Sequence, residues 1–192
     1  MADSKISALT SATTPLAGTE VLPIVQSGST VKVAVSDLTA GRNIGVLGVV
    51  GTTTNNNATA GCVGEYVSST VGPASLLALT SPTARDITSI SLTAGDWDVA
   101  GIIGFGGISG TSVVAFVGGN ASSSSGGISP SIGIQVLMNG STQISTVADM
   151  TAALPVYRYS LAATTTMYLV ARASYTTGSI GAYGTISARR IR

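Results

Sequence analysis

The feature that most limits how this chain can fold is a long run without charge. From Val99 through Ala148 the sequence contains no Asp, Glu, Lys or Arg. The run consists mainly of Gly, Ser, Thr and aliphatic residues. β-Branched residues favour strands, and Gly at this frequency disfavours long helices. We therefore expect the uncharged run to form buried strands of an all-β protein.

Charge is scarce in the rest of the chain as well. Only 9% of the 192 residues are charged, 44% are hydrophobic, and the formal net charge is +1. A soluble domain usually has about a quarter charged residues, whereas disordered chains combine low hydrophobicity with high net charge. The chain is therefore expected to fold, as one sizeable core or as a short arm plus one domain.

Composition also excludes several kinds of chemistry. The sequence has no His, and Cys62 is its single cysteine. A Ser-His-Asp triad, a Cys-His pair, a zinc site and a disulfide framework are all excluded. We expect no enzymatic activity, no cofactor and no metal, and we interpret Cys62 as a small buried hydrophobic residue.

The basic residues concentrate near the end of the sequence. Five arginines follow Asp149, the last acid. We interpret them as the solvated side of a last strand, because a nucleic-acid binder needs a larger cluster of Lys and Arg. The near-neutral charge predicts no nucleic-acid partner.

Residues 99–119 are mostly Gly and apolar and are therefore a candidate membrane span. A span needs about 20 predominantly apolar residues. Ser109, Thr111 and Ser112 interrupt this segment, and no Lys or Arg anchors it. We predict no membrane span, and strands in its place.

The N-terminal part predicts a small hairpin. Valines alternate with other residues over positions 31–35, and residues 20–26 form the expected partner strand. Ser27-Gly28 is the expected turn, and Pro23 indicates an edge strand. Because an isolated hairpin is only marginally stable in water, this arm is expected to need a partner surface.

Three segments follow from the change in composition along the chain. Residues 1–43 form the arm, residues 44–60 are a linker rich in Gly, Thr and Asn, and residues 61–192 form a β-sandwich or jelly-roll domain. The strands expected in this domain are 62–70, 86–92, 96–105, 111–117, 131–138, 142–147, 155–161, 165–175 and 182–191.

Two local patterns predict how these strands are connected. Aliphatic residues occupy every second position from 132 to 138 and therefore share one face of a strand. Asn139-Gly140 follows, and this dipeptide favours a type I′ turn. Residues 118–127, with four consecutive serines, predict a long flexible loop.

Asp96 and Asp98 are the candidate reactive groups. They flank Trp97, so both carboxylates project from one face of a strand, where they could share a cation or act as acid and base. Alternation of polar and apolar residues after the turn at 93–95 explains the same acids. We favour this structural interpretation.

Five tyrosines leave a similar choice open. They could present an aromatic sugar-binding surface, but in strands such residues more often pack with a hydrated hydroxyl. They are Tyr157, Tyr159, Tyr168, Tyr175 and Tyr183.

A surface with so little charge is inexpensive to dehydrate against a neighbour. Edge strands without Lys would also aggregate in a monomer. We therefore expect an obligate oligomer.

The N-terminal segment carries a resemblance to a known family. Its motifs are KISAL at 5–9, TTPLAGTE at 13–20, LPIVQ at 22–26 and VSDL at 35–38. This segment resembles the opening of many tail-fibre, tailspike and related virion proteins of tailed bacteriophages. The resemblance implies an arm that attaches to the virion, with docking carried by Lys5, Ile6, Leu9, Pro15, Leu22, Pro23, Ile24 and Val25.

The remaining sequence looks like a domain of phage structural proteins, through VGEYV at 63–67, LTAGDWDV at 92–99 and ISARR at 186–190. The GDW strand start is also similar to trimeric jelly-roll heads of the tumour-necrosis-factor type. The resemblance implies a homotrimeric virion protein assembled in the bacterial cytoplasm, with tail, portal-adaptor or capsid proteins as partners.

Three roles are weighed on this basis. The first is a short tail fibre or a fibre-base or adaptor component without enzymatic activity, which the arm favours. The alternative is a capsid decoration, cement or head-fibre protein. A polysaccharide-binding or depolymerising tailspike comes third, and in that role a host surface glycan would be a partner.

Overall fold

The structure is a computed structural model that describes residues 19–35, 54–128, 135–145 and 149–192. The chain divides into two compact units, residues 1–54 and 55–192. Apart from the short 3-10 turns, the regular elements described are strands, so the all-β prediction is confirmed. A search of these residues finds no helix of the length and apolarity that a membrane crossing requires. The sites predicted at Lys5, Ile6, Leu9 and Pro15 lie outside the described residues.

The N-terminal unit contains the predicted hairpin. Strand β1 (Val21–Gln26) pairs antiparallel with β2 (Ser29–Ala34). Ser27 and Gly28 form the turn with φ values of 51° and 79°, and two positive values are typical of a type I′ turn. Pro23 lies in β1, as expected for an edge strand.

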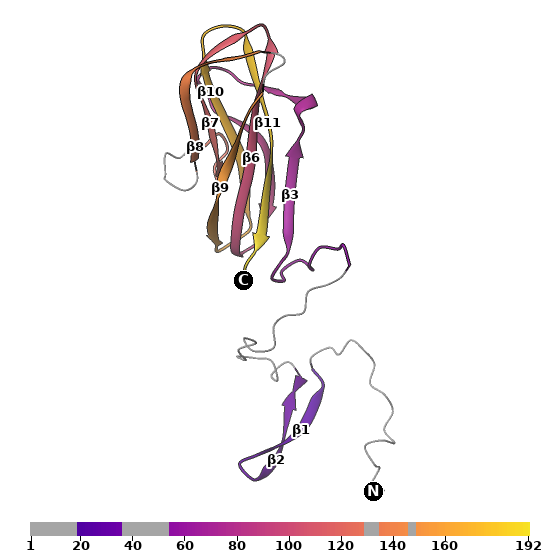
Figure 1. The fold of residues 1–192 in the computed structure, drawn as a ribbon. Helices are drawn as coiled ribbons and strands as arrows, with labels where there is room; N and C mark the ends of the chain where they lie inside the picture. Colours follow the sequence, from indigo (N-terminus) through magenta and orange to yellow (C-terminus); the bar gives the residue numbers. More distant parts are fainter. Residues whose placement is uncertain (1–18, 36–53, 129–134, 146–148) are drawn as a thin grey trace. The chain divides into compact units, whose positions relative to one another are not determined.

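The second unit is a sandwich of two antiparallel sheets, which Figure 1 shows as two layers of strands. The strands of sheet I, in spatial order, are β5 (Arg85–Leu92), β10 (Thr165–Tyr175), β7 (Ser112–Ser122) and β8 (Gln135–Ile144). Those of sheet II are β3 (Tyr66–Val71), β11 (Ser179–Arg190), β6 (Gly95–Ser109) and β9 (Met150–Leu161), with the short β4 (Leu77–Ala78) also paired to β11. A 3-10 turn, η3 (Pro73–Ser75), precedes β4.

The pairing order makes this sandwich a jelly roll. β3 pairs with β11, β5 with β10, β6 with β9 and β7 with β8. These nested pairs describe one long two-stranded ribbon that folds over on itself, and further pairing of β11 with β6 and of β10 with β7 joins the turns of the ribbon. Nested antiparallel pairing of this kind is the jelly-roll arrangement. The jelly-roll prediction is confirmed.

The core lies between the two sheets. Large side chains from both sheets are fully buried there, including Trp97, Phe105, Met167 and Leu169. Burying one such side chain contributes about 1.5 to 3 kcal/mol. The sheets approach closely because small residues face the large ones: a Cβ at Gly119 on β7 would lie 2.4 Å from Cδ1 of Ile103 on β6, in the opposite sheet.

The predicted turn at Asn139-Gly140 is wrong. β8 runs through both residues, so the two predicted strands 131–138 and 142–147 form one strand over the described part. Gly140 takes a φ of 150°, and the register with β7 shifts between Val114 and Phe116. Asn139 therefore stays paired with Phe116 and a bulge follows at Gly140, because pairing along β7 outweighs the local turn preference. Val136 and Met138 share one face, as predicted, and pack against the core, whereas residues 132 and 134 lie outside the described residues.

Two further expectations are corrected. Residues 118–122 of the predicted loop belong to β7, where all five pair with β10 and residues 118–120 also pair with β8. Cys62 is exposed. It lies in a turn between Gly61 and Gly64, both with positive φ, so β3 begins four residues later than the predicted strand.

Candidate interaction surface

The outer side of sheet II carries a broad surface without charged side chains, which we call the open face. Strand register places its residues in two rows. Thr70, Thr185, Ile102 and Ala153 follow one another across the four strands, and a second row contains Ser68, Ser187 and Ala100. Tyr66 lies at the β3 end of the adjacent row. The open face comprises Tyr66, Ser68, Thr70, Ala100, Ile102, Ala153, Thr185 and Ser187.

The side chains of the open face are accessible to solvent, and removing water from them costs little free energy. Ile102 is 53% exposed and Tyr66 is 44% exposed. A shallow hollow of about 300 Å³ lies among Tyr66, Ala100, Gly101, Ile102, Thr185 and Ser187. The hydroxyls of Thr70 and Thr185 are 2.9 Å apart and hydrogen-bond each other. Because these hydroxyls are already partnered, covering them costs less than covering free polar groups.

Charged residues begin in the row of Tyr66, whose register partner is Arg189. Arg189 is the register partner of Asp98, and Asp98 is the register partner of Arg158. Basic, acidic and basic residues therefore alternate across three strands. A neighbour with the same row could place its acid against either arginine.

Asp96 belongs to the same end of the sheet but is not available for chemistry. Its carboxylate is 3% exposed, accepts a hydrogen bond of 2.8 Å from Arg158, and also pairs with Arg192. The hydrogen bond from Arg158, followed by those from Ser160 and Arg192, lowers the pKa of Asp96 to about 2, against the opposing effect of desolvation. Asp96 is therefore an anion held by two cations, and the structural interpretation of the acid pair is the one that the geometry supports.

A second ion pair closes the end of the domain. Arg190 donates from Nε to Glu65 Oε2 at 2.9 Å, and its guanidinium lies 4.3 Å from the ring centroid of Trp97. Arg190 also donates to the carbonyl oxygen of Ala94 at 2.8 Å. A backbone hydrogen bond from Gly61, together with Arg190, lowers the pKa of Glu65. These contacts tie the end of β11 to the segments that precede β3 and β6.

This corrects the interpretation of the terminal arginines as solvated. Arg190 is 5% exposed, whereas its neighbour Arg189 is exposed. Glu65 is 125 positions away in the sequence, so no local pattern could have identified the pair. Among the described residues, no group of three or more His, Cys, Asp or Glu side chains is placed to hold a metal ion.

The outer side of sheet I differs, because a loop of its own chain covers part of it. Asp86 accepts hydrogen bonds from the Ser125 hydroxyl at 2.5 Å and from the Gly126 amide at 2.7 Å. Asn120, whose register position lies on this side, is fully buried. Arg172 lies over the Phe116 ring, 5.1 Å from its centroid. This side therefore combines charged groups with an intramolecular cover.

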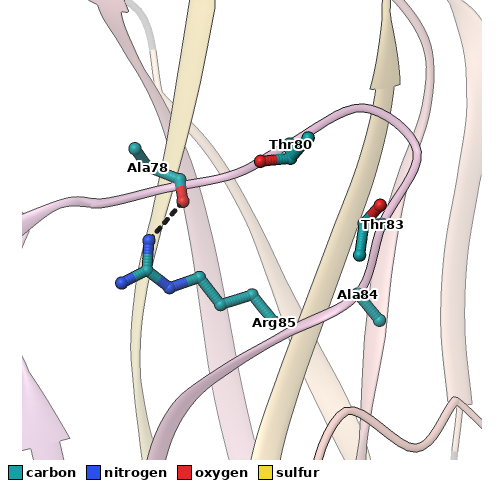
Figure 2. A pocket seen from close by; sticks show the side chains of 5 residues that line it. All are labelled: Ala78, Thr80, Thr83, Ala84 and Arg85. Carbon is teal, nitrogen blue, oxygen red and sulfur yellow. Dashed lines mark hydrogen bonds between the residues drawn. The ribbon is translucent and has the colours of Figure 1, made fainter.

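A second hollow, of about 180 Å³, lies beside the loop that precedes β5 (Figure 2). Arg85 supplies the one charged group of its lining, and Arg85 Nη1 donates to the carbonyl oxygen of Ala78 at 2.6 Å. The other lining residues are Thr80, Thr83 and Ala84. The guanidinium of Arg85 is already hydrogen-bonded, and the threonines and alanines around it supply no general acid or base.

Three of the five predicted tyrosines have a hydroxyl bound within the molecule, whereas Tyr157 is 44% exposed. The hydroxyls of Tyr159 and Tyr175 donate to the carbonyl oxygens of Ala121 and Leu79, at 3.0 and 2.6 Å. Tyr183 donates to Asp149 at 3.1 Å. The aromatic residue on the open face is Tyr66, which is not among the five predicted tyrosines. The alternation of exposed and partly buried residues along β3 was the sequence signal that could have identified it.

The hairpin sorts the predicted arm residues onto two faces. Leu22 and Ile24 share one face with Val33 and Val31, their register partners. Pro23 and Val25 lie on the opposite face. Val25 is 75% exposed and Leu22 is 45% exposed, so aliphatic surface is displayed on both sides.

These observations define the second unit as a jelly-roll β-sandwich with one outer side partly covered by its own chain and one left open. No protein-family model matches the sequence, and no curated protein matches it either.

Solved structures of infectious bursal disease virus show remote similarity. The Gx strain structure has 14% identity and a TM-score of 0.41, covering 75% of this chain and 36% of that chain. The VP2 subviral particle has 13% identity and a TM-score of 0.39, covering 75% and 38%. The chain thus spans little more than a third of the length of those two chains. Similarity at this level does not identify a family.

Proposed function

We propose that the chain is a virion structural protein without enzymatic activity, a short tail fibre or a fibre-base or adaptor component. The observation that carries the proposal is the N-terminal segment. It resembles the attachment arm of phage tail proteins, and its described part is a two-stranded hairpin with exposed Leu22, Val21 and Val25. Aliphatic surface of this kind on so small a sheet requires a partner.

The β-domain is proposed to be the projecting part and to form a homotrimer through the open face. An uncharged face with Ile102 and Tyr66 exposed supports this assignment. The adjoining row of Arg189, Asp98 and Arg158 supplies both signs of charge, so copies of the same row can complement each other. The number three comes from the resemblance to phage trimers.

The alternative role is a capsid decoration or head-fibre protein, with a capsid protein as the partner of the arm. A host surface glycan is a further candidate ligand, because the hollow on the open face combines the Tyr66 ring with the hydroxyls of Thr185 and Ser187. Self-association and glycan binding compete for this face, and the exposed Ile102 favours self-association.

The test is the copy number of the chain in purified virus particles, measured by quantitative gel electrophoresis. A tail component is expected at tens of copies or fewer, and a capsid component at hundreds. Deleting residues 1–41 should leave a folded β-domain that is absent from the particles. Incorporation of the truncated chain at normal copy number would refute the role of the arm.

A further inference from the structure

The hairpin register determines which backbone groups are free to bind another strand. In antiparallel pairs, residues that exchange backbone hydrogen bonds alternate with residues whose N–H and C=O groups point away. The amide of Val35 donates to the carbonyl oxygen of Glu20 at 2.8 Å, and Gln26 and Ser29 pair directly across the turn. The exchanging positions are therefore 20, 22, 24 and 26 on β1, with 29, 31, 33 and 35 on β2.

The outward positions of β1 are 21, 23 and 25, and proline occupies the middle one. Proline has no N–H, so the outer edge of β1 lacks the central donor that an added strand would use. Proline at this position is a common means of preventing strand addition. The β1 edge is therefore closed.

The outward positions of β2 are Thr30, Lys32 and Ala34. All three have a backbone N–H and C=O, and β2 pairs with β1 alone within the described part of the chain. This edge is therefore able to accept another strand. Next to it, Leu22, Ile24, Val31 and Val33 form an aliphatic face that would be covered at the same time.

Lys32 indicates the chemistry of the added strand. It is the central outward residue of β2, so its cross-strand neighbour in an added strand would lie within contact distance. In the register that pairs all three outward residues of two copies, Lys32 would face Lys32, and like charges directly opposite are destabilising. Such pairing is also twofold and does not close a trimer. An acidic residue on a different protein is the complementary neighbour.

We propose that the arm docks by β-strand addition: the open edge of β2 pairs with an exposed strand edge of another virion protein, which places an acidic side chain opposite Lys32. The aliphatic face of Leu22, Ile24, Val31 and Val33 packs against that protein beside the new strand. This inference rests on the proposed function, because it specifies how the arm attaches to the particle.

The test uses the full chain and a matched pair of proline variants. Val25 and Thr30 are register partners, equally distant from the turn, and both point their N–H groups outward, on opposite edges. Thr30→Pro therefore blocks the β2 edge, and Val25→Pro blocks the β1 edge. We expect Thr30→Pro to lower the copy number in purified particles at least about tenfold, and Val25→Pro to leave it within about twofold. Protected amide exchange at Ile24 in both proteins would show that the hairpin persists.

A second pair of variants tests the charge. Lys32→Glu keeps the backbone donor and reverses the charge, so incorporation should fall about tenfold, whereas Lys32→Arg should retain it. Equal incorporation of all four variants would refute strand addition at β2. Loss with Val25→Pro but not with Thr30→Pro would refute it too. A lower mass of the free Thr30→Pro protein in light scattering would assign the edge to a second copy and overturn the proposal.

The failure of the proposed function is recognised separately. If wild-type chain is absent from purified particles, the virion assignment fails before any variant is compared. If wild-type chain is present and Thr30→Pro is incorporated normally, the virion assignment stands and the inference about the β2 edge fails.

Discussion

The two outer sides of the sandwich differ in how they are covered. The outer side of sheet I is partly covered by the chain itself, through the loop that Ser125 and Gly126 anchor to Asp86, although Leu137 on this side is 43% exposed. The outer side of sheet II has no such cover over its central rows, although Ile102 is more than half exposed. The first side has a partial cover and charged groups from its own molecule, whereas the central rows of the second have neither and are suited to contact with another molecule.

The placement of charge follows the same division. On sheet II, Asp96, Asp98 and three of the arginines collect at one end and leave the central rows uncharged. On sheet I, Asp86 and Arg172 lie within the face and make contacts inside the molecule. In a chain with 9% charged residues, this distribution leaves one large surface for a neighbour with similarly little charge.

The largest expected effect comes from a charge placed on the open face. An unpaired carboxylate buried at a contact costs about 3 kcal/mol or more, so Ile102→Asp should weaken self-association at least about a hundredfold. Ser89→Asp, on the exposed outer side of sheet I, should not change it. Light scattering at low and high salt measures both. Equal dissociation of the two variants would remove the distinction between the faces.

The next effect concerns the charged end of sheet II. Arg190→Ala removes the partner of Glu65 and the contact with Trp97, and should lower the free energy of unfolding by about 3 kcal/mol. Arg189→Ala, at the exposed neighbouring position, should change it by less than about 0.5 kcal/mol. Denaturant unfolding gives both values. Similar values for the two variants would show that the buried ion pair does not secure this end.

The contribution of Asp96 should depend on pH. Its pKa is about 2 in the folded protein and 3.8 as the ordinary value, so its stabilising effect is complete above the ordinary value and is lost as pH falls through the folded one. The difference in unfolding free energy between wild type and Asp96→Asn should therefore be constant above about pH 5, shrink below about pH 4 and level off at its smallest value below about pH 1. Glu65 is present in both proteins and cancels. A difference independent of pH would exclude the charge pairing as its cause.

The smallest effect is expected on the covered side. Asp86→Asn weakens the two hydrogen bonds that anchor the loop, and should lower the free energy of unfolding by about 1 kcal/mol. Amide exchange at Gly126 should become faster, while exchange in the centre of β10 stays slow. Unchanged exchange at Gly126 would mean that the loop covers sheet I without this anchor.

How far the sequence predicted this molecule depended on the range of each interaction. Alternation within one strand was sufficient for β10, whose bounds at Thr165 and Tyr175 match the expectation, and for the hairpin around Ser27-Gly28. The Asn139-Gly140 turn failed because its local preference was outweighed by a partner strand that the sequence does not identify.

The existence of an interaction surface could be predicted from the sequence, but its position could not. Scarcity of charge indicated a buried outer side, but it did not indicate which side, since that depends on where Asp86 meets the serine loop 40 positions away. Burial of Arg190 depends on Glu65, which lies 125 positions away in the sequence. Alternation favoured a structural role for the acid pair, but it did not identify the two arginines that hold Asp96.

The nested ribbon has a consequence for the order of events during synthesis. β11 is the last strand of the jelly roll in the chain, yet it lies inside sheet II between β3 and β6. While the ribosome is still adding this segment, β3 and β6 have no common neighbour, and the core lacks Ile180 and Ile186. Folds dominated by such distant pairings form slowly. A chain that stops before β11 cannot complete the sandwich, so the topology itself excludes prematurely terminated chains from any assembly that requires a folded domain.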